Sequence, residues 1–428
     1  MLENKSISIY LVLGGDFFGS GGWAKYVREL AHFLNNYGYQ VKIVCRMGKI
    51  FPYHIKMNIS DGAKFRQSKV ISKHKGMHLS YLLQHLPNPL TIAIGTIRVI
   101  REIKYDEAAQ KVVHAHDLSS SFFIAYLLWK LLKIPYVVQI HGFPLREWKI
   151  KLMNSTNHLL RNFVWFLTKM LHNLAISLIK NSSTILLVNN SEVKSFYERC
   201  GIPSNKIKIM PSAINLHECK KYLLPRDYAR KILGLAESEV VTIGYIGGLK
   251  PEKNVETLVK AFEGFVKSCP KAKAKLIIIG DGPTRPILEE YVRERGIENI
   301  VSFLGFIPNA YKLLNAIDIF VLPSLSEGSP IALIEAMSSG KAIIASDIPA
   351  IKELVEDGKE ALLFDPRDPV QLKNLILKLY NDPELRKKLG ENAKRKAEQY
   401  NVDVVFPKML QIYKEVVAYN FAREETSR

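Results

Sequence analysis

Short β-branched runs alternate with amphipathic stretches along almost the whole of this 428-residue chain. In the amphipathic stretches apolar residues recur at helical spacing, whereas the runs between them are apolar at nearly every position. Strands that are apolar throughout are buried on both faces, which is typical of parallel sheets covered by helices. The number of such units, about ten, exceeds one ordinary doubly wound sheet. The pattern therefore predicts an α/β protein with two domains.

The expected strands are 6–13, 41–45, 112–115, 136–140, 184–188, 241–246, 275–279, 300–303, 317–322 and 342–345. The expected helices include 24–34, 255–266, 285–294 and 331–337. A polar and basic stretch that opens with a proline, 211–222, separates the two groups of strands and indicates a linker. We therefore expect a first domain over 1–217 and a second over 218–405, with a helix at 406–428 that packs back on the first.

Positive charge is concentrated in the first half of the chain. The whole sequence has 60 Lys and Arg against 41 Asp and Glu, a formal net charge of +19. Residues 1–200 hold 26 basic and 11 acidic side chains, whereas residues 201–428 hold 34 and 30. This imbalance predicts an anionic partner for the first half, such as nucleic acid, anionic lipid or a phosphorylated substrate. Because no base-stacking or groove-binding motif accompanies the charge, we do not expect nucleic acid.

A basic and apolar stretch, 148–180, lies in the same half. Its apolar residues recur at helical spacing among lysines and arginines, which favours a helix pair with a buried face and leaves open an interfacial membrane helix. The basic stretch 64–75 is either a solvated loop or part of a contact with an anionic surface. The longest uncharged run, 76–97, is too polar and too interrupted to span a membrane. We expect a cytoplasmic protein, with peripheral attachment to the inner face of the membrane as an open alternative.

The segment 317–340 carries the clearest chemical signal. Its apolar strand runs into a loop with Glu327 and Gly328, and Ser329 is the expected N-cap of a helix whose first residue is Pro330. Glycine lets the backbone approach a ligand closely, and the unsatisfied N–H groups of a helix start favour a phosphate. Capping alone explains the serine, the proline and the closing glycine. It does not explain the two glutamates that frame this turn.

Histidines end two strands of the first half. His141 follows the apolar run 136–140 and precedes a glycine, at a carboxyl end where loops carry binding residues, so a functional role is favoured over a structural one. His114, His116 and Asp117 are metal ligands by type. Because they alternate along a strand that enters a loop, packing and capping roles are favoured for them, with one of the three left open as an acceptor contact.

Glu327 and Glu335 stand with seven residues between them, in the setting Ser-Glu-Gly-Ser-Pro-Ile-Ala-Leu-Ile-Glu-Ala-Met. This resembles the E-x7-E motif of the family 4 retaining glycosyltransferases, whose GT-B fold has two Rossmann-like doubly wound domains facing a central cleft. The resemblance is nearly continuous over the second half and thinner over the first. It extends to the segments 280–283, 305–308, 355–358, 364–366, 113–117 and 140–142.

The resemblance implies a retaining enzyme that moves a hexosyl unit from a nucleotide-diphospho-sugar to a glycan or lipid-linked acceptor. No cofactor and no metal would be needed, and the sequence has no D-x-D pair. Glu335 would hold the ribose and Glu327 the transferred sugar. The implied donor-binding residues are Gly21, Gly22, Lys253, Phe306, Ile307, Glu327, Gly328, Ser329, Pro330, Ile331 and Glu335. The implied catalytic residues are Glu327, His141 and Lys253.

Two places depart from the family pattern, the stretch 211–215 and position 248, and the second leaves alternatives open. Relatives place an arginine and a lysine five residues apart after the first strand of the second domain, but here Gly248 stands where the arginine is expected, with Lys253 in place. Loss of one cation at a leaving group costs a few kcal/mol of transition-state stabilisation. A catalytically weak nucleotide-sugar-binding or scaffold protein is therefore one alternative. Gly19, Gly21 and Ala24 leave an NADP-dependent oxidoreductase as a second, although no acid follows the next strand.

Overall fold

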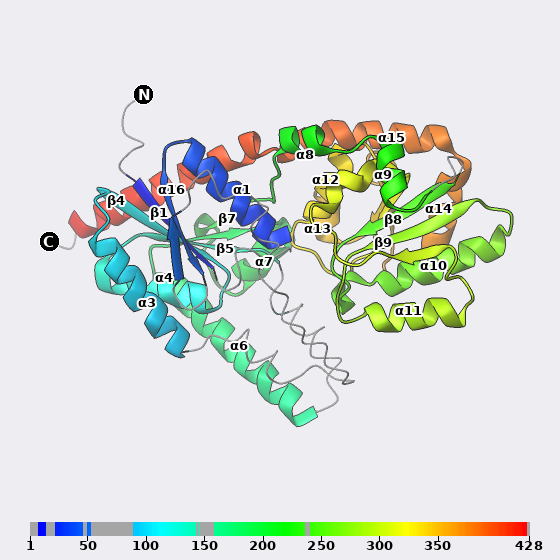
Figure 1. Ribbon diagram of the computed structural model, residues 1–428. Coiled ribbons are helices and arrows are strands. Elements are labelled where there is room, and N and C mark those ends of the chain that lie inside the picture. Colours follow the sequence, from blue (N-terminus) through cyan, green and yellow to red (C-terminus); the bar gives the residue numbers. More distant parts are fainter. Residues whose placement is uncertain are drawn as a thin grey trace. The chain divides into compact units, whose positions relative to one another are not determined.

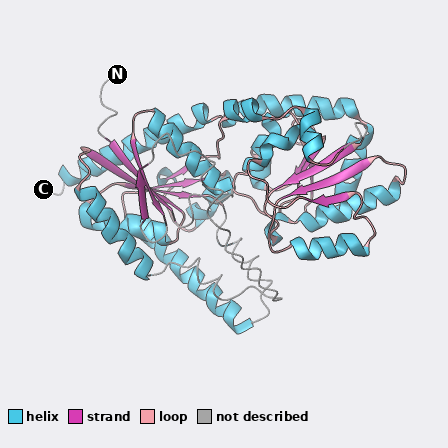
Figure 2. Cartoon of the chain, in the orientation of Figure 1, coloured by secondary structure: helices cyan, strands magenta, loops and turns pink. Residues whose placement is uncertain are grey.

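The computed structural model describes residues 7–13, 22–45, 49–52, 89–142, 145, 158–235 and 240–425. The chain forms two compact units. Unit 1 consists of Met1–Met210 and Phe406–Arg428, and unit 2 of Pro211–Val405. Each unit has its strands gathered in one layer with helices around it (Figure 2). The expected α/β class with two Rossmann-like domains is confirmed.

Unit 1 contains a seven-stranded sheet in the order β3-β2-β1-β4-β5-β6-β7. All neighbouring strands are parallel except β2 and β3, which are antiparallel. Helices α3, α4 and α6 lie on one face of this sheet, and α1 and α16 on the other (Figure 1). The strands are β1 (Ile7–Leu13), β2 (Gln40–Cys45), β3 (Lys49–Pro52), β4 (Gln110–His116), β5 (Tyr136–Ile140), β6 (Ile185–Val188) and β7 (Ile207–Ile209). The helices are α1 (Gly22–Asn36), α3 (Pro89–Lys104), α4 (Ser120–Leu132), α6 (His158–Lys180), α7 (Ser191–Arg199) and α16 (Val402–Glu425), with a 3-10 turn at Ser204–Lys206.

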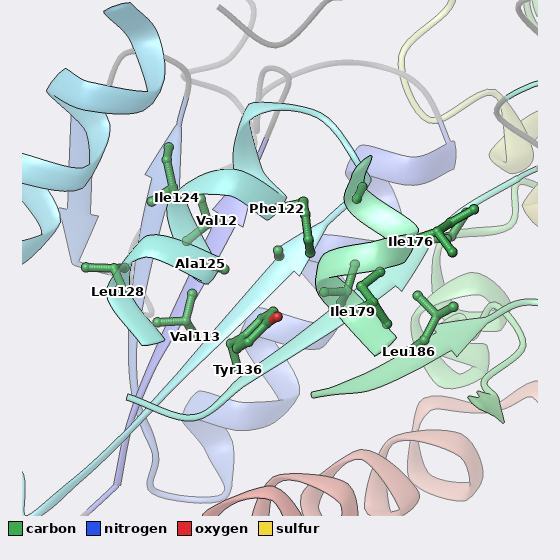
Figure 3. Packing of buried hydrophobic residues seen from close by; sticks show 14 of the residues in the cluster. Val12, Val113, Phe122, Ile124, Ala125, Leu128, Tyr136, Ile176, Ile179 and Leu186 are labelled. Atoms are coloured by element: carbon green, nitrogen blue, oxygen red, sulfur yellow. The ribbon is translucent and has the colours of Figure 1, made fainter. Parts of the chain in front are cut away.

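The core of unit 1 forms where α4 and α6 meet the sheet. Phe122 of α4 and Ile179 of α6 lie against strand residues such as Tyr136 and Leu186 (Figure 3). All four side chains are at most 1% exposed. Removal of this much apolar surface from water is the main force that holds the two helices on the sheet.

Unit 2 contains a six-stranded, fully parallel sheet in the order β10-β9-β8-β11-β12-β13. This is the doubly wound arrangement in which the first and fourth strands are neighbours. The strands are β8 (Val241–Ile246), β9 (Ala274–Ile279), β10 (Val301–Phe303), β11 (Ile319–Leu322), β12 (Ala342–Ser346) and β13 (Leu362–Phe364). The α-helices are α8 (Leu216–Tyr222), α9 (Arg226–Ile232), α10 (Val255–Ser268), α11 (Arg285–Glu294), α12 (Ile331–Ser338), α13 (Pro349–Lys352), α14 (Pro369–Asn381) and α15 (Pro383–Ala397). The 3-10 segments are Pro251–Lys253, Ala310–Ala316 and Glu398–Tyr400.

The chain passes between the units twice, after Met210 and again at Val405. The first crossing falls seven residues before the position 217 expected from the sequence. Residues just after it belong to unit 2 because Ile214 forms a parallel bridge to Asn401, and the Val402 N–H donates to the Ile214 carbonyl at 3.1 Å. Among the residues that the structure describes, no helix is long and apolar enough to cross a membrane.

Candidate functional site

The candidate site of unit 2 lies at the carboxyl ends of β8 and β11. These strands are neighbours in the sheet, but the connections that follow them lead to opposite sides, which makes this the switch point where doubly wound sheets bind ligands. The connection after β8 carries Lys253 in a 3-10 turn, and the connection after β11 carries Glu327. Residues 74 positions apart in the chain are thereby brought together.

Lys253 and Glu327 form a close ion pair. The ammonium Nζ lies 2.7 Å from one carboxylate oxygen of Glu327 and 2.8 Å from the other. The Ser324 hydroxyl donates to the same carboxylate at 2.6 Å. The Glu327 side chain is only 7% exposed, against 26% for Lys253. The carboxylate is therefore fixed from two sides, with the cation between it and solvent.

The two loops that carry this pair are also joined directly. The Leu325 N–H donates to the Glu252 carbonyl at 2.9 Å. Asn254 is in the left-handed conformation, with φ of 52°, and its amide donates to the carbonyls of Pro323 and Pro366 at 3.0 and 2.7 Å. Asparagine tolerates this conformation better than most residues. The position of Lys253 is thus set by the residue that follows it.

Helix α12 begins at Ile331, so Pro330 is not its first residue. Its N-cap is Pro330, and no side chain caps it. The Ser329 hydroxyl instead accepts from the Ser212 backbone N–H at 3.0 Å, so the expected N-cap role of Ser329 is wrong because a tertiary partner takes the hydroxyl. Pro330 has no N–H, so of residues 328–331 Gly328, Ser329 and Ile331 have a backbone N–H at this turn. Glu335 lies on α12 one turn beyond its start and is 8% exposed.

Two glycines bring the loop after β9 against the loop after β8. A Cβ at Gly280 would lie 1.8 Å from the Gly247 carbonyl oxygen, and one at Gly282 would lie 2.2 Å from the Leu249 oxygen. Both glycines have φ between +140° and +160°, a region that other residues rarely adopt. Farther along the same edge Phe306 is 44% exposed, whereas Ile307 packs against a small apolar cluster. Of these two expected base contacts, Phe306 presents the larger surface.

Gly248 has room for a side chain. A Cβ there would meet nothing closer than Cε of Lys250 at 3.8 Å, and its φ is outside the left-handed region. Glycine is therefore not required by the backbone at this position. The stem of Lys250 lies beside the point from which an arginine side chain would start.

In unit 1 His141 lies among aromatic rings at the end of β5. Its Nε2 is 2.9 Å from Nδ1 of His116, and the two rings are stacked. Trp23 and Tyr26, from the first turns of α1, lie edge-on to His141 at 6.2 and 5.1 Å between ring centroids. The helix that starts at Gly22 therefore begins beside His141. Gly21 lies outside the described residues.

The same cluster continues inward to α16. His114 stacks on His116, with 4.1 Å between the ring centroids, and its Nδ1 is 2.8 Å from the hydroxyl of Tyr413. Burial lowers the pKa of His141 and of His114 to about 3, and lowers that of His116 well below its usual range. All three are neutral at neutral pH. Asp117 accepts from the N–H of Ser119, the N-cap of α4, at 2.8 Å; this contact closes a turn before the helix and does not cap it.

In the described ranges no group of three or more His, Cys, Asp and Glu side chains is placed to hold a metal ion. In the histidine cluster Nδ1 of His116 faces Nε2 of His141, and Nδ1 of His114 faces the Tyr413 hydroxyl. Among the described residues, Nε2 of His114 and Nε2 of His116 are buried without a hydrogen-bond partner. The basic stretch 64–75, the uncharged run 76–97 up to residue 88, and the first part of 148–180 lie outside the described residues.

Two protein-family models together match nearly the whole chain. Residues 20–218 match the family described as Glycosyltransferase Family 4, and residues 226–396 match Glycosyl transferases group 1. The chain belongs to the family 4 type of glycosyltransferases.

Curated relatives of this glycosyltransferase are about one quarter identical to it. N-acetyl-alpha-D-glucosaminyl L-malate synthase of Bacillus anthracis is 26% identical over 84% of this chain and 88% of the relative. Alpha-monoglucosyldiacylglycerol synthase of Acholeplasma laidlawii is 25% identical over 76% and 79%. An Escherichia coli relative is 25% identical over 68% and 70%, and its name is UDP-Gal:alpha-D-GlcNAc-diphosphoundecaprenol alpha-1,3-galactosyltransferase.

Solved structures confirm the fold. Sucrose-phosphate synthase from Thermosynechococcus elongatus aligns with a TM-score of 0.73 and 20% identity, covering 96% of this chain and 99% of that one. The Anabaena HepE protein in complex with UDP-glucose aligns with a TM-score of 0.67 and 18% identity, covering 95% and 99%. The glycosyltransferase has the GT-B fold, with two Rossmann-like domains.

The residues that support the site of this glycosyltransferase were not predicted from its sequence. Ser324 and Asn254 were not expected to take part, although each lies within three residues of Glu327 or Lys253. The contact between His116 and His141 was also missed. The available signal was that both histidines end neighbouring strands, since carboxyl ends of parallel strands meet at one edge.

Proposed function

We propose that this glycosyltransferase is a retaining, metal-independent hexosyltransferase that uses a nucleotide-diphospho-sugar as donor. The observation that carries the proposal is the contact of Lys253 with both oxygens of Glu327 at the switch point of unit 2. A carboxylate held in this way suits the hydroxyls of a sugar, and an ammonium beside it suits the phosphate that leaves. Family membership and the placement of both residues on loops at strand ends support this assignment.

Glu327 would accept hydrogen bonds from the transferred sugar, and Lys253 would contact the diphosphate. In the present geometry the two side chains bind each other, so a diphosphate oxygen would compete with the carboxylate for the ammonium. The start of α12 supports the same anion, since its first-turn N–H groups and its dipole favour negative charge. Glu335, buried one turn along α12, would accept from the ribose hydroxyls.

The reaction would form a bond between an acceptor oxygen and the anomeric carbon while the bond from that carbon to the phosphate oxygen breaks. The departing phosphate oxygen would take the acceptor proton on the same face of the sugar, which retains the configuration. No carboxylate is assigned as a nucleophile. The negative charge that grows on the diphosphate would be offset by Lys253 and by Lys250, whose stem lies beside Gly248. The roles of His141, Gly21 and Gly22 stay predictions from the sequence.

The acceptor would be a glycan or a lipid-linked sugar. One relative is named for the synthesis of a glucosyl diacylglycerol, and another for transfer to a diphosphoundecaprenol-linked sugar. The donor assignment is supported by the structural neighbour that was solved with UDP-glucose. Because the excess positive charge lies in residues 1–200 rather than in unit 2, an anionic membrane surface on the acceptor side is part of the same proposal.

The test is nucleotide release from UDP-, GDP- and ADP-sugars, measured for the wild type, Glu327→Gln and Lys253→Met. Each variant should lower kcat about a hundredfold or more, the usual cost of a lost transition-state contact. A matched control is Lys260→Met, because Lys260 forms a pair of similar length with Glu256 on the exposed side of α10. That control should retain wild-type turnover. Activity within about twofold of wild type in both site variants would contradict the assignment.

A second candidate is a protein that binds nucleotide sugars with little turnover, because Gly248 replaces an expected cation. Calorimetry with each nucleotide sugar decides between the two. Binding without turnover on any acceptor would favour the binding protein, whereas loss of turnover in Lys253→Met with retained donor binding would favour the enzyme.

A further inference from the structure

Helix α6 has two opposite apolar faces, and one of them is exposed. We call the set Leu159, Phe163, Phe166, Met170 and Leu174 the α6 outer face. Its members are between 46% and 85% exposed. They are spaced by four, three, four and four residues, which places them within about 80° of arc at 100° per residue. A continuous strip of large exposed apolar side chains over four turns of helix is a mark of an interaction surface.

The opposite face of α6 fixes the helix in the fold. Ala175, Ile176 and Ile179 belong to the core cluster of unit 1, and Val164 is fully buried. Figure 3 shows Ile176 and Ile179 directed toward the sheet. Since these residues alone explain why α6 packs where it does, the outer face is not needed for folding. Water contact of so much apolar surface is unfavourable and calls for a partner.

The charge around this face is of one sign. Helix α6 has no acidic residue. At 100° per residue, Lys169 and Lys180 lie beside one edge of the outer face, whereas Arg161 lies on the opposite side of the helix. From Leu118 to Ser191 the sequence has eight lysines and arginines and a single acid, Glu147. An apolar strip with lysines along its edge is the pattern of a helix that lies in a membrane interface. Anionic headgroups attract each such cation.

We infer that the α6 outer face docks on an anionic lipid surface, with its apolar side chains inserted among the headgroups and acyl chains. A second copy of the chain suits the face less well, because both copies carry the same basic border and a formal charge of +19. The inference rests on the proposed function in one respect, the role of docking, which would bring the enzyme to an acceptor held in a membrane. It extends that proposal by naming the surface and the lipid class.

The test is sedimentation of the full-length chain with phosphatidylcholine vesicles, with and without phosphatidylglycerol, in the absence of donor and acceptor. Wild type should bind only the vesicles that contain phosphatidylglycerol, and high salt should release it. Phe163→Ser combined with Phe166→Ser should weaken binding at least about tenfold, since two phenylalanines lose their burial. The matched control is Ile287→Ser with Val370→Ser, which removes two apolar side chains of comparable exposure from unit 2.

A charge variant separates the electrostatic contribution to vesicle binding from the apolar contribution. Lys169→Gln keeps the apolar strip and should weaken binding to anionic vesicles about fivefold, the effect of one cation near such a surface. Far-ultraviolet circular dichroism during urea denaturation, which follows both units, should show unchanged stability for every variant, because all substituted residues are exposed. Equal binding to neutral vesicles, an equal effect of the control pair, or self-association in solution that Phe163→Ser and Phe166→Ser abolish would overturn the inference. Nucleotide release on a soluble acceptor is measured separately, so failure of docking and failure of the proposed function are distinguishable.

Discussion

Removal of the Lys253 ammonium should destabilise unit 2 in a way that a second substitution repairs. The Glu327 carboxylate is 7% exposed, and among the described residues it accepts two hydrogen bonds from Lys253 and one from Ser324. Lys253→Met leaves the Glu327 carboxylate buried, with the Ser324 hydroxyl as its hydrogen-bond donor. Loss of one partner of a buried pair costs about 3–5 kcal/mol, and the 26% exposure of Lys253 places this case near about 3 kcal/mol.

For a unit spanning Pro211–Val405 such a loss lowers the melting temperature by about 6–12 °C. The double variant Lys253→Met with Glu327→Gln removes both charges and should recover at least about 2 kcal/mol relative to the sum of the two single effects. Lys260→Met, at the exposed pair with Glu256, should cost no more than about 1 kcal/mol.

The chain offers a convenient assay because its four tryptophans, at positions 23, 129, 148 and 165, all lie in unit 1. Far-ultraviolet circular dichroism follows both units during urea denaturation, whereas tryptophan fluorescence follows unit 1. Lys253→Met should shift the denaturation curve seen by circular dichroism and leave the curve seen by tryptophan fluorescence unchanged. A loss below about 1 kcal/mol, or strict additivity in the double variant, would refute the view that Lys253 neutralises a buried carboxylate.

Three further predictions address the neighbouring glycines and the histidines. Gly248→Arg should raise kcat for nucleotide release about tenfold, because the position has room for a side chain and arginine adds a cation. Gly248→Gln adds no cation and should leave kcat unchanged. No gain with arginine would show that position 248 does not face the leaving group. Gly280→Ala should lower the free energy of unfolding by about 3 kcal/mol or more, since its Cβ would lie 1.8 Å from a carbonyl oxygen. Gly296→Ala, whose Cβ would have no atom within 4 Å, should lower it by about 1 kcal/mol. Thermal unfolding measures both, and equal losses would contradict this prediction. Burial lowers the pKa of His141 to about 3, whereas in the unfolded chain the histidine binds its proton near pH 6.5. The stability of unit 1 should therefore be level above about pH 6.5 and should fall on acidification toward pH 3. The expected loss is up to about 1.4 kcal/mol per pH unit for each such histidine. Tryptophan fluorescence during urea denaturation at each pH measures this, and a flat profile from pH 6.5 to 4 would contradict the burial of neutral histidines.

The α/β class was predictable because its signal is local. Strands buried on both faces must be apolar throughout, and most of the strands that the sequence indicated in this way, such as β8 (Val241–Ile246), are parallel and central, although β10 (Val301–Phe303) lies at a sheet edge. Strand β3 (Lys49–Pro52) was missed because it is short, contains a proline and lies at the sheet edge, paired antiparallel. Edge strands need no apolar alternation, so their sequences do not differ from those of loops.

Side-chain contacts across the sheet edge were less predictable. The proximity of Lys253 and Glu327 depends on strand order, which local periodicity does not contain, and only the resemblance to a family pointed to both. The expected cap at Ser329 failed because Ser212, 117 residues away, donates to its hydroxyl. Helical spacing indicated an apolar helix at α6 (His158–Lys180), yet it did not show which of its two apolar faces the protein covers.

The two crossings between the units have a consequence for the order in which the protein is made. Unit 2 is one continuous segment, Pro211–Val405, inserted in a unit 1 that is closed by α16. Tyr413 contacts the buried His114, and Phe406 packs on Tyr26, so unit 1 is incomplete until residues beyond 405 leave the ribosome. The unit that comes second in the sequence is therefore free to finish folding first.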